Sequence, residues 1–229
     1  MISVVIPTLN AEATLGPTLA ALVPAVVDSV VQEGIIVDGG SSDETIAIAD
    51  AAGTKVIMAK RGRGSQLHAG AAVARGDWLL FLHADTVLEP GWAEEAEAFM
   101  ERVAAGRRAP AAAAFRFSLD DDGLMPRLVE WLVGLRCLLF ALPYGDQGLL
   151  ISRRLYNELG GFKPMPLMED VDLVRRLGRR RLAMLKSRAV TSGARYRRDG
   201  YLARSLRNLC CMLLYFLRLP TRMLARFYG

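Results

Sequence analysis

The fold is decided by residues 79–86, which read Leu-Leu-Phe-Leu-His-Ala-Asp-Thr. This apolar run stops at a lone carboxylate, Asp85, and predicts a buried strand that carries an acid at its carboxyl end. In open α/β sheets ligands bind outside the carboxyl ends of the strands, so Asp85 is well placed to hold a metal ion or a sugar nucleotide. The alternative is that Asp85 only caps the turn into Glu89-Pro90.

Strand-like and helix-like segments alternate around this run. Strands are predicted at 3–6, where Pro7 ends the pattern, at 34–37, 55–58 and 78–82, with helices at 15–26, 46–52 and 66–74 between them. Parallel neighbours require crossover connections, and these helices fill them. The sequence therefore predicts a doubly wound α/β fold, a mostly parallel sheet with helices on both faces.

The second half of the chain continues the alternation less regularly. We expect a helix at 92–103, a strand at 111–118, a helix at 128–142, a strand at 149–151 and a helix at 167–177. The apolar segment at 128–142 is too short to span a bilayer and contains Glu130 and Arg136, so a buried or interfacial helix is expected. The acidic run 120–123 is predicted to be a solvated turn and not a metal site, because contiguous acids before Gly usually serve turn chemistry.

The composition indicates one large domain with a substantial core, since 52% of the 229 residues are hydrophobic. Cys137, Cys210 and Cys211 are too few for a disulfide framework, and no His partners stand at zinc-ligand spacing. We expect free thiols in a reducing compartment. The first residues enter a strand without a basic segment or a cleavage site, so a cytoplasmic protein is predicted.

The net charge of +5 is unevenly distributed. Beyond Asp172 there are fifteen Lys and Arg against one acid, Asp199, so the remainder of the chain is acidic. We divide the sequence into a main domain at 1–196 and a basic, amphipathic helical tail at 197–229, broken by Pro220. Interleaved apolar residues favour an anionic membrane surface over nucleic acid as the partner of the tail, and therefore a peripheral position at the inner face of the cell membrane. Packing on the parent domain, or on a partner in an oligomer, is the alternative.

Five motifs stand in register along residues 1–190. They are Val-Val-Ile-Pro-Thr-Leu-Asn-Ala-Glu at 4–12, Val-Asp-Gly-Gly-Ser-Ser-Asp at 37–43, Arg-Gly-Arg-Gly at 61–64, Phe-Leu-His-Ala-Asp-Thr at 81–86 and Met-Glu-Asp at 168–170. In order and spacing they resemble the family 2 glycosyltransferases of the GT-A fold, and within that family a small bacterial group linked to arsenosugar biosynthesis. The resemblance implies an inverting, metal-dependent enzyme that moves one sugar from a nucleotide donor, most simply a UDP-sugar, to a hydroxyl acceptor, with lipid-linked acceptors included.

The resemblance assigns the donor nucleotide to residues near the first two strands. Pro7 and Thr8 would line the base, Glu12 would contact the nucleoside, and Asp38 would accept from uracil N3–H, as an ionised carboxylate can. Without the family, Asp38 reads as an Asx turn and Glu12 as a first-turn helix acid. Arg63, in a basic loop with glycines, would approach the diphosphate or the donor sugar, and a solvated loop is its alternative.

Asp85 corresponds to an acid of the family's Asp-x-Asp motif, which coordinates Mg2+ or Mn2+ on the donor diphosphate. Such hard cations need oxygen ligands. His83 stands where the family has the first acid of the motif, which leaves the metal contact standing and puts the ribose contact in question.

Asp170 is the predicted catalytic base, which accepts the proton of the acceptor hydroxyl as its oxygen attacks the anomeric carbon. Glu169 would share the site, and like-charge repulsion would raise one pKa of the pair. Without the family, the two read as first-turn acids that stabilise a helix. By the same resemblance, Asp146 and Gln147 would lie near the acceptor or the donor sugar.

Two other functions compete with sugar transfer. A nucleotidyltransferase would preferably show a Gly-rich loop after the first strand, where Pro7-Thr8-Leu9-Asn10 stands. A non-catalytic sugar-nucleotide-binding or membrane-associated protein is the second, although the presence of both Asp85 and Asp170 argues against it.

Overall fold

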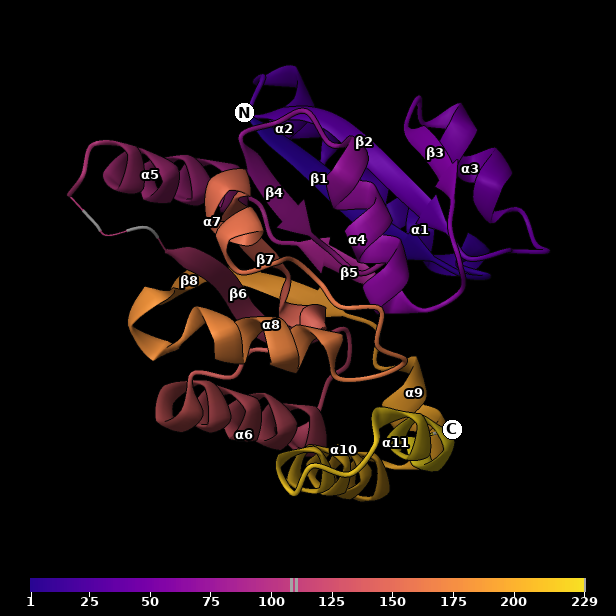
Figure 1. The fold of residues 1–229 in the computed structure, drawn as a ribbon. Coiled ribbons are helices and arrows are strands. Elements are labelled where there is room, and N and C mark those ends of the chain that lie inside the picture. The colour runs from indigo at the N-terminus through magenta and orange to yellow at the C-terminus, as the bar shows by residue number, and fades with distance from the viewer. Residues whose placement is uncertain (108, 110, 229) are drawn as a thin grey trace.

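The computed structural model describes residues 1–107, 109 and 111–228. Figure 1 shows its elements, which follow in the order β1 (Ile2–Thr8), α1 (Glu12–Ala20), α2 (Val23–Val27), β2 (Val31–Asp38), α3 (Thr45–Ala51), β3 (Lys55–Met58), α4 (Arg63–Val73), β4 (Trp78–Phe81), β5 (Thr86–Leu88), α5 (Trp92–Ala104), β6 (Ala112–Leu119), α6 (Leu124–Phe140), the 3-10 turn η1 (Gly145–Gln147), β7 (Leu149–Ser152), α7 (Arg153–Glu158), α8 (Glu169–Leu177), η2 (Arg179–Arg181), β8 (Leu182–Thr191), α9 (Ala194–Asp199), α10 (Tyr201–Phe216) and α11 (Thr221–Tyr228).

The strands of the described residues form one eight-stranded sheet in the order β3-β2-β1-β4-β7-β6-β8-β5. Strands β3, β2, β1 and β4 are mutually parallel, as are β6 and β8, whereas β7 and β5 run antiparallel to their neighbours. The predicted α/β fold with a mostly parallel sheet is confirmed. After β1 the chain adds β2 and β3 on one side and then β4 on the other, and such a reversal opens a crevice beyond the strand ends.

Helices cover both faces of the sheet, because successive side chains of each strand point into two different apolar cores (Figure 1). Val4 and Ile6 of β1 face a core shared with α1 and α5. Val5, between them, faces a core shared with α4, α7 and α8. Close packing on both faces fixes the strand ends, and therefore the loops that extend beyond them.

The prediction that Pro7 ends the first strand is wrong. Strand β1 continues to Thr8. Along β1 the carbonyl of Val5 bonds to Leu82 on the β4 side, and the carbonyl of Thr8 bonds to Gly39 on the β2 side. By this alternation Pro7 faces the β4 side, where β4 has already ended. The missing N–H of Pro7 therefore costs no ladder hydrogen bond.

Strand β8 is absent from the predicted elements because charged side chains interrupt its apolar pattern. Lys186 and Arg188 project outward from it, and Leu185 and Ala189 are among its few buried apolar residues. Its position comes from backbone pairing, parallel to β6 and antiparallel to β5. Non-local pairing of this kind leaves little trace in the sequence.

The C-terminal helices pack on the body of the molecule, which is one of the two alternatives predicted for the tail. Cys211 of α10 and Leu224 of α11 are buried against Leu167 and Val171 of the α8 region. Leu202, Leu206, Leu209 and Leu213 of α10 remain exposed, as does Leu217 directly after the helix. In the part of the chain that the structure describes, no helix has both the length and the apolar character needed to cross a bilayer.

The acidic turn after β6 was predicted to be solvated. In the structure it also connects β6 to the C-terminal helices through side-chain contacts. Asp120 accepts a hydrogen bond from the Gly193 amide, and Asp121 forms an ion pair with Arg197 (3.1 Å) and accepts from the Tyr201 hydroxyl. The carboxylates of Asp120 and Asp121 are therefore structural links, that of Asp122 is exposed, and the three are not directed at one ion.

Replacing Gly70 by Ala is expected to destabilise the fold by about 1–3 kcal/mol, because cores tolerate overpacking poorly. A Cβ at Gly70 would lie 2.4 Å from Val5 Cγ1 and 2.8 Å from Val37 Cγ2, where α4 crosses the sheet. Gly16 in α1 is the matched control, since a Cβ there meets nothing within 4 Å and Ala is the better helix former. Urea unfolding measures both variants, and equal free energies of unfolding for them would contradict the packing argument.

Candidate active site

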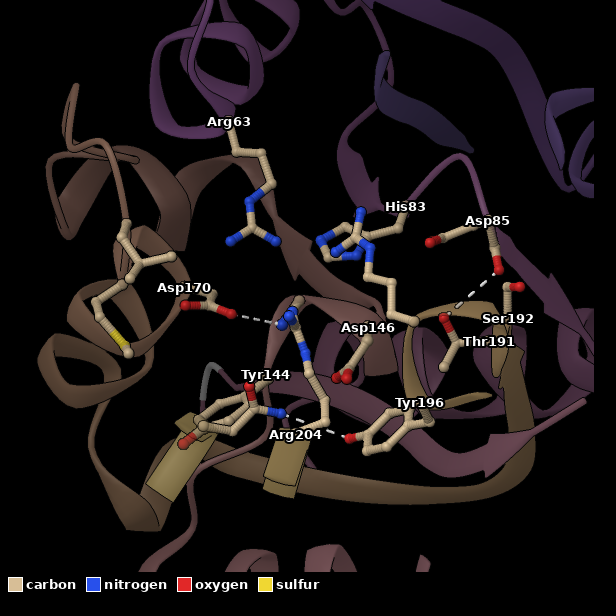
Figure 2. A pocket seen from close by; sticks show the side chains of 15 residues that line it. Arg63, His83, Asp85, Tyr144, Asp146, Asp170, Thr191, Ser192, Tyr196 and Arg204 are labelled. Carbon is tan, nitrogen blue, oxygen red and sulfur yellow. Dashed lines mark hydrogen bonds between the residues drawn. The ribbon is translucent and has the colours of Figure 1, made fainter. Parts of the chain in front are cut away.

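A cavity of about 90 Å³ lies beyond the carboxyl ends of β4 and β8 and beside the start of α8. Figure 2 shows the side chains of Asp85, Asp146 and Asp170 arranged around it, together with His83 and Arg63. A larger hollow of about 500 Å³ adjoins this cavity and extends to the end of β1. The two spaces share Arg63, His83 and Asp85, so a ligand long enough to fill both would cross these residues.

Asp85 stands where the sequence places it, four residues beyond the last residue of β4. Its backbone carbonyl accepts from the Ser192 amide at 3.1 Å, which fixes the loop against the end of β8. Its carboxylate side chain belongs to the wall of both spaces. The turn-cap alternative does not account for that position.

His83 is held as a neutral imidazole. Burial, reinforced by the nearby positive charge of Arg63, lowers its pKa to about 4, against the opposing effects of Asp85 and Asp170. Gly145 packs closely on the ring, since a Cβ at that position would lie 2.6 Å from His83 Nε2. His83, which stands in place of the first acid of the Asp-x-Asp motif, therefore adds no charge to the cavity at neutral pH.

Asp170 lies in the first turn of α8 and faces the cavity, as predicted. Its Oδ2 accepts from the Gly145 amide at 2.7 Å, and its Oδ1 accepts from the amide of Val171 at 2.7 Å. Met168, just before the helix, adopts a left-handed conformation with φ of 67°. These contacts hold the carboxylate at a fixed position opposite Asp85.

Glu169 is buried at 1% exposure and forms an ion pair with Arg63, with Nε and Oε1 2.9 Å apart. Its other oxygen, Oε2, is buried without a hydrogen-bond partner. Burial raises the pKa of Glu169, Asp170 adds to that rise, and Arg63 opposes it. The pair links the start of α4 to the start of α8, so Glu169 orients Arg63 at the wall of the cavity.

Asp146 and Gln147 are adjacent in η1 but take different positions. Asp146 faces the cavity, and its Oδ1 is buried without a hydrogen-bond partner. Gln147 is buried and points into the protein, where its amide nitrogen donates to the Phe115 carbonyl at 2.9 Å and its Oε1 accepts from Arg136 at 3.2 Å. Gln147 therefore holds the turn that presents Asp146.

Of the residues predicted to bind the nucleotide base, some line the larger hollow and others are hydrogen-bonded within the protein. Pro7 and Thr8 line the larger hollow. Asp38 is fully buried and accepts from the Thr8 hydroxyl and from Ser41 and Gly40, which lowers its pKa against the opposing effect of burial.

The contact of Asp38 with uracil N3–H, implied by the family, would require one of these protein donors to be displaced. Glu12 accepts from the Glu44 amide at 3.1 Å and so braces the start of α3. Both acids hold loops in this structure, in agreement with the alternatives predicted without the family.

Several cavity residues escape sequence reasoning because they come from late in the chain. They are Tyr144, Thr191, Ser192, Arg195, Tyr196, Arg204 and Asn208. The excess of arginine beyond Asp172 is a signal that this region faces an anion, but it does not say which arginines converge. Their convergence depends on β8, α9 and α10.

The stability of the ligand-free protein is predicted to depend on pH through the ionisation of Asp146. Burial, with Asp170 and Asp85 acting in the same direction and Arg136 and Arg63 opposing it, raises the pKa of Asp146 to about 6 from the model-compound value of 3.8. The folded state then binds more protons than the unfolded state, so stability falls as pH rises from about 4 to about 6 and levels off above it.

The free energy of unfolding is expected to fall by up to about 3 kcal/mol over this pH range. Asp146→Asn should abolish this part of the pH dependence and unfold at higher urea concentration than the wild type at pH 8. Urea unfolding from pH 4 to pH 8 measures the effect, and parallel pH profiles of the two proteins would contradict it.

Comparison with known proteins agrees with this geometry. The sequence profile described as Glycosyl transferase family 2 matches residues 3–132. A glucosyl-3-phosphoglycerate synthase of Mycolicibacterium paratuberculosis is 36% identical over 95 residues, covering 38% of this chain and 29% of the relative. A PGL/p-HBAD biosynthesis glycosyltransferase of Mycobacterium bovis is 38% identical over 101 residues, covering 38% of this chain and 36% of the relative. The chain therefore spans about a third of the length of these curated relatives.

Among solved structures, glucosyl-3-phosphoglycerate synthase from Mycobacterium tuberculosis superposes with a TM-score of 0.59 at 26% identity, over 83% of this chain and 71% of that one. That crystal contains Mn2+, uridine diphosphate and glucosyl-3-phosphoglycerate. Another crystal of the same protein contains Mn2+, UDP-glucose and phosphoglyceric acid, with a TM-score of 0.58 at 26% identity, over 81% of this chain and 69% of that one. A further crystal contains Mg2+ and uridine diphosphate. The profile covers more than half of the sequence, and the chain belongs to glycosyl transferase family 2.

Proposed function

We propose that the protein transfers a single sugar from a UDP-sugar to a hydroxyl acceptor with inversion at the anomeric carbon. The observation that carries this proposal is the placement of Asp85 and Asp170 on one cavity, from a strand end and a helix start, beside a hollow large enough for a nucleotide. The relatives crystallised with UDP or UDP-glucose support the choice of donor.

The nucleotide is proposed to occupy the larger hollow. Pro7 and Thr8 would line the base, while Asp38 and Glu12 would support this end through the loops that they hold. Arg61, Arg63 and Arg195 also line the hollow, and their guanidinium groups match the charge and geometry of a diphosphate. The diphosphate would then lie near Asp85.

A divalent metal fits the residues present at Asp85. Among the described residues no three His, Cys, Asp or Glu side chains form a metal-binding cluster. Mg2+ is usually held by one or two carboxylates together with substrate phosphates, so one acid beside a diphosphate site is sufficient. When bound, Mg2+ or Mn2+ would neutralise charge that develops on the leaving diphosphate. The neutral ring of His83 would add no competing charge.

Asp170 is proposed as the general base. The acceptor oxygen would form a bond to the anomeric carbon, the bond from that carbon to the diphosphate would break, and the hydroxyl proton would pass to Asp170. The Gly145 amide holds the carboxylate in position for this transfer. Glu169 would act by orienting Arg63, and Asp146 would contact the acceptor or the donor sugar.

Peripheral attachment to an anionic membrane is a further part of the proposal. Leucines are exposed along α10, and on α11 the exposed Met223 and Phe227 stand among the exposed Arg222 and Arg226. This is the composition of helices that lie in a membrane interface. A division of the chain at residue 196 and kinship with the arsenosugar-associated group are further parts of the same proposal. Liposome flotation of Leu213→Asp against the wild type tests the attachment, and equal flotation would oppose it.

The proposed activity is tested by incubating the full chain with UDP-, GDP- and dTDP-sugars and Mn2+ and measuring nucleotide release. Release from a UDP-sugar supports sugar transfer, and the anomeric configuration of the product, read by NMR, tests inversion. Pyrophosphate chemistry on a nucleoside triphosphate would favour the nucleotidyltransferase. Tight UDP binding without any release would favour the non-catalytic alternative.

A further inference from the structure

An apolar groove runs between α6 and α10 and has a volume of about 370 Å³. Figure 1 shows these two helices side by side at one end of the molecule. The apolar residues that line the groove are Val129, Leu132, Val133, Leu135, Leu139, Phe140, Leu202, Leu206, Leu209 and Met212. This volume lies within the range of about 300–1,000 Å³ that small-molecule sites occupy.

The groove is continuous with the catalytic cavity at one end. Tyr144, Asp146, Tyr196 and Asn208 line both spaces. Figure 2 shows Tyr144, Asp146 and Tyr196 on the side of the cavity opposite Arg63 and His83. A ligand in the groove therefore reaches the reacting centre from the side away from the proposed base-binding hollow.

The junction between the two spaces is polar, and three buried polar atoms at or near it have no hydrogen-bond partner among the described residues. Asp146 Oδ1, Ser205 Oγ and Asn208 Oδ1 are buried without a hydrogen bond, and all three residues line the groove. Buried polar atoms of this kind cost free energy unless a ligand or water satisfies them. The gradient from an apolar groove to polar acceptors beside Asp170 matches a molecule with a hydrocarbon chain and a hydroxylated head.

We propose that the groove binds the hydrocarbon chain of an amphiphilic acceptor, whose hydroxyl enters the cavity through the junction and is glycosylated there. This inference rests on the proposed function and specifies its acceptor. The hydroxyl oxygen forms the new bond to the anomeric carbon, UDP leaves with the electrons of the broken bond, and Asp170 takes the hydroxyl proton. A small acid such as phosphoglyceric acid, present in the crystals of the relatives, would leave the groove empty.

The first test is a chain-length series of primary alcohols from butanol to dodecanol, used below their aqueous solubility limits with UDP-glucose and Mn2+. Burial of each added methylene is expected to raise kcat/KM about three- to fourfold until the groove is filled. Decyl phosphate and phosphoglyceric acid serve as further arms, which separate a lipid alcohol from a lipid phosphate and from a small anion. A rate that does not change with chain length would overturn the proposal.

Matched variants test where the hydrocarbon chain of the acceptor binds. Leu139 and Leu206 line the groove and are 52% and 60% exposed, whereas Leu138 and Leu213, on the same two helices, are 69% and 51% exposed and lie outside it. Leu139→Asp and Leu206→Asp should weaken decanol binding at least about tenfold by calorimetry, and Leu138→Asp and Leu213→Asp should change it less than twofold. Circular dichroism checks that all four fold.

The outcomes separate the groove from other uses of the same surface. Equal losses in all four variants would indicate a general membrane surface and overturn the groove. A wild-type dimer that Leu139→Asp dissociates, without decanol binding, would assign the face to a second copy. Transfer of glucose to any acceptor of the series tests the catalytic proposal separately: its absence with every acceptor, together with intact decanol binding, would defeat sugar transfer and leave the chain-binding groove supported.

Discussion

Asp170→Asn is expected to reduce sugar transfer by about 10²–10⁴-fold and to change UDP affinity less than about twofold. The amide is nearly isosteric with the carboxylate, and its one oxygen can still accept from the Gly145 N–H, although the hydrogen bond from the Val171 N–H is lost, so the turn should survive. It cannot take the proton of the acceptor hydroxyl, which removes general-base catalysis. Single-turnover transfer from UDP-glucose and calorimetric titration with UDP measure the two quantities.

Asp172→Asn is the control for this variant. Asp172 lies in the same first turn of α8 but forms ion pairs with Arg176 at 2.6 Å and Lys163 at 3.1 Å. Its loss should lower stability and leave the chemical step within about threefold of the wild type. Comparable transfer rates for Asp170→Asn and the wild type would remove Asp170 from the role of base.

Asp85→Asn is expected to abolish the effect of Mn2+ on UDP binding and to lower transfer by at least about 10²-fold, a loss typical of removed transition-state charge stabilisation. In the wild type, EDTA should weaken UDP binding by at least about tenfold, because the proposed cation would be held by Asp85 together with the diphosphate. The backbone contact from Ser192 to the Asp85 carbonyl does not depend on the side chain, so the loop should keep its position.

Calorimetry of UDP binding with Mn2+ and with EDTA measures this effect. Asp122→Asn is the matched control, since Asp122 is an acid whose side chain is fully exposed. It should show the same response to the metal as the wild type. An Asp85 variant that retains the full response to Mn2+ would move the metal to other ligands.

The first half of the fold was predictable because its signals are local. Strands β1 to β4 are short, mostly apolar runs, and the helices between them have regular apolar spacing. Because parallel strands present their carboxyl ends at one edge, the sequence could also place Pro7, Thr8 and Asp85 together. Asp170 could be assigned to a helix start from the same kind of local pattern.

The other part of the site depends on contacts that no local pattern encodes. For Asp38 and Gln147 the family resemblance implied ligand contacts, whereas Asp38 without the family reads as an Asx turn. In the structure Asp38 is enclosed by donors from Thr8, Gly40 and Ser41, and Gln147 is enclosed by partners from three separate segments. Whether a polar side chain faces a cavity or fills a turn is decided by tertiary packing, which also brings Arg204 and Asn208 to the cavity.

The link between the acidic turn and α9 has a consequence for experiments on the C-terminal region. Asp120 and Asp121 fasten β6 to the segment that begins at Gly193, and the helices that follow carry Arg204 and Asn208 into the wall of the cavity. Shortening the chain after residue 196 would remove this wall along with any membrane contact. A truncated protein would be a different catalyst and not the same catalyst without an anchor, so substitution of an exposed α10 residue outside the groove, such as Leu213, is the cleaner way to separate attachment from turnover.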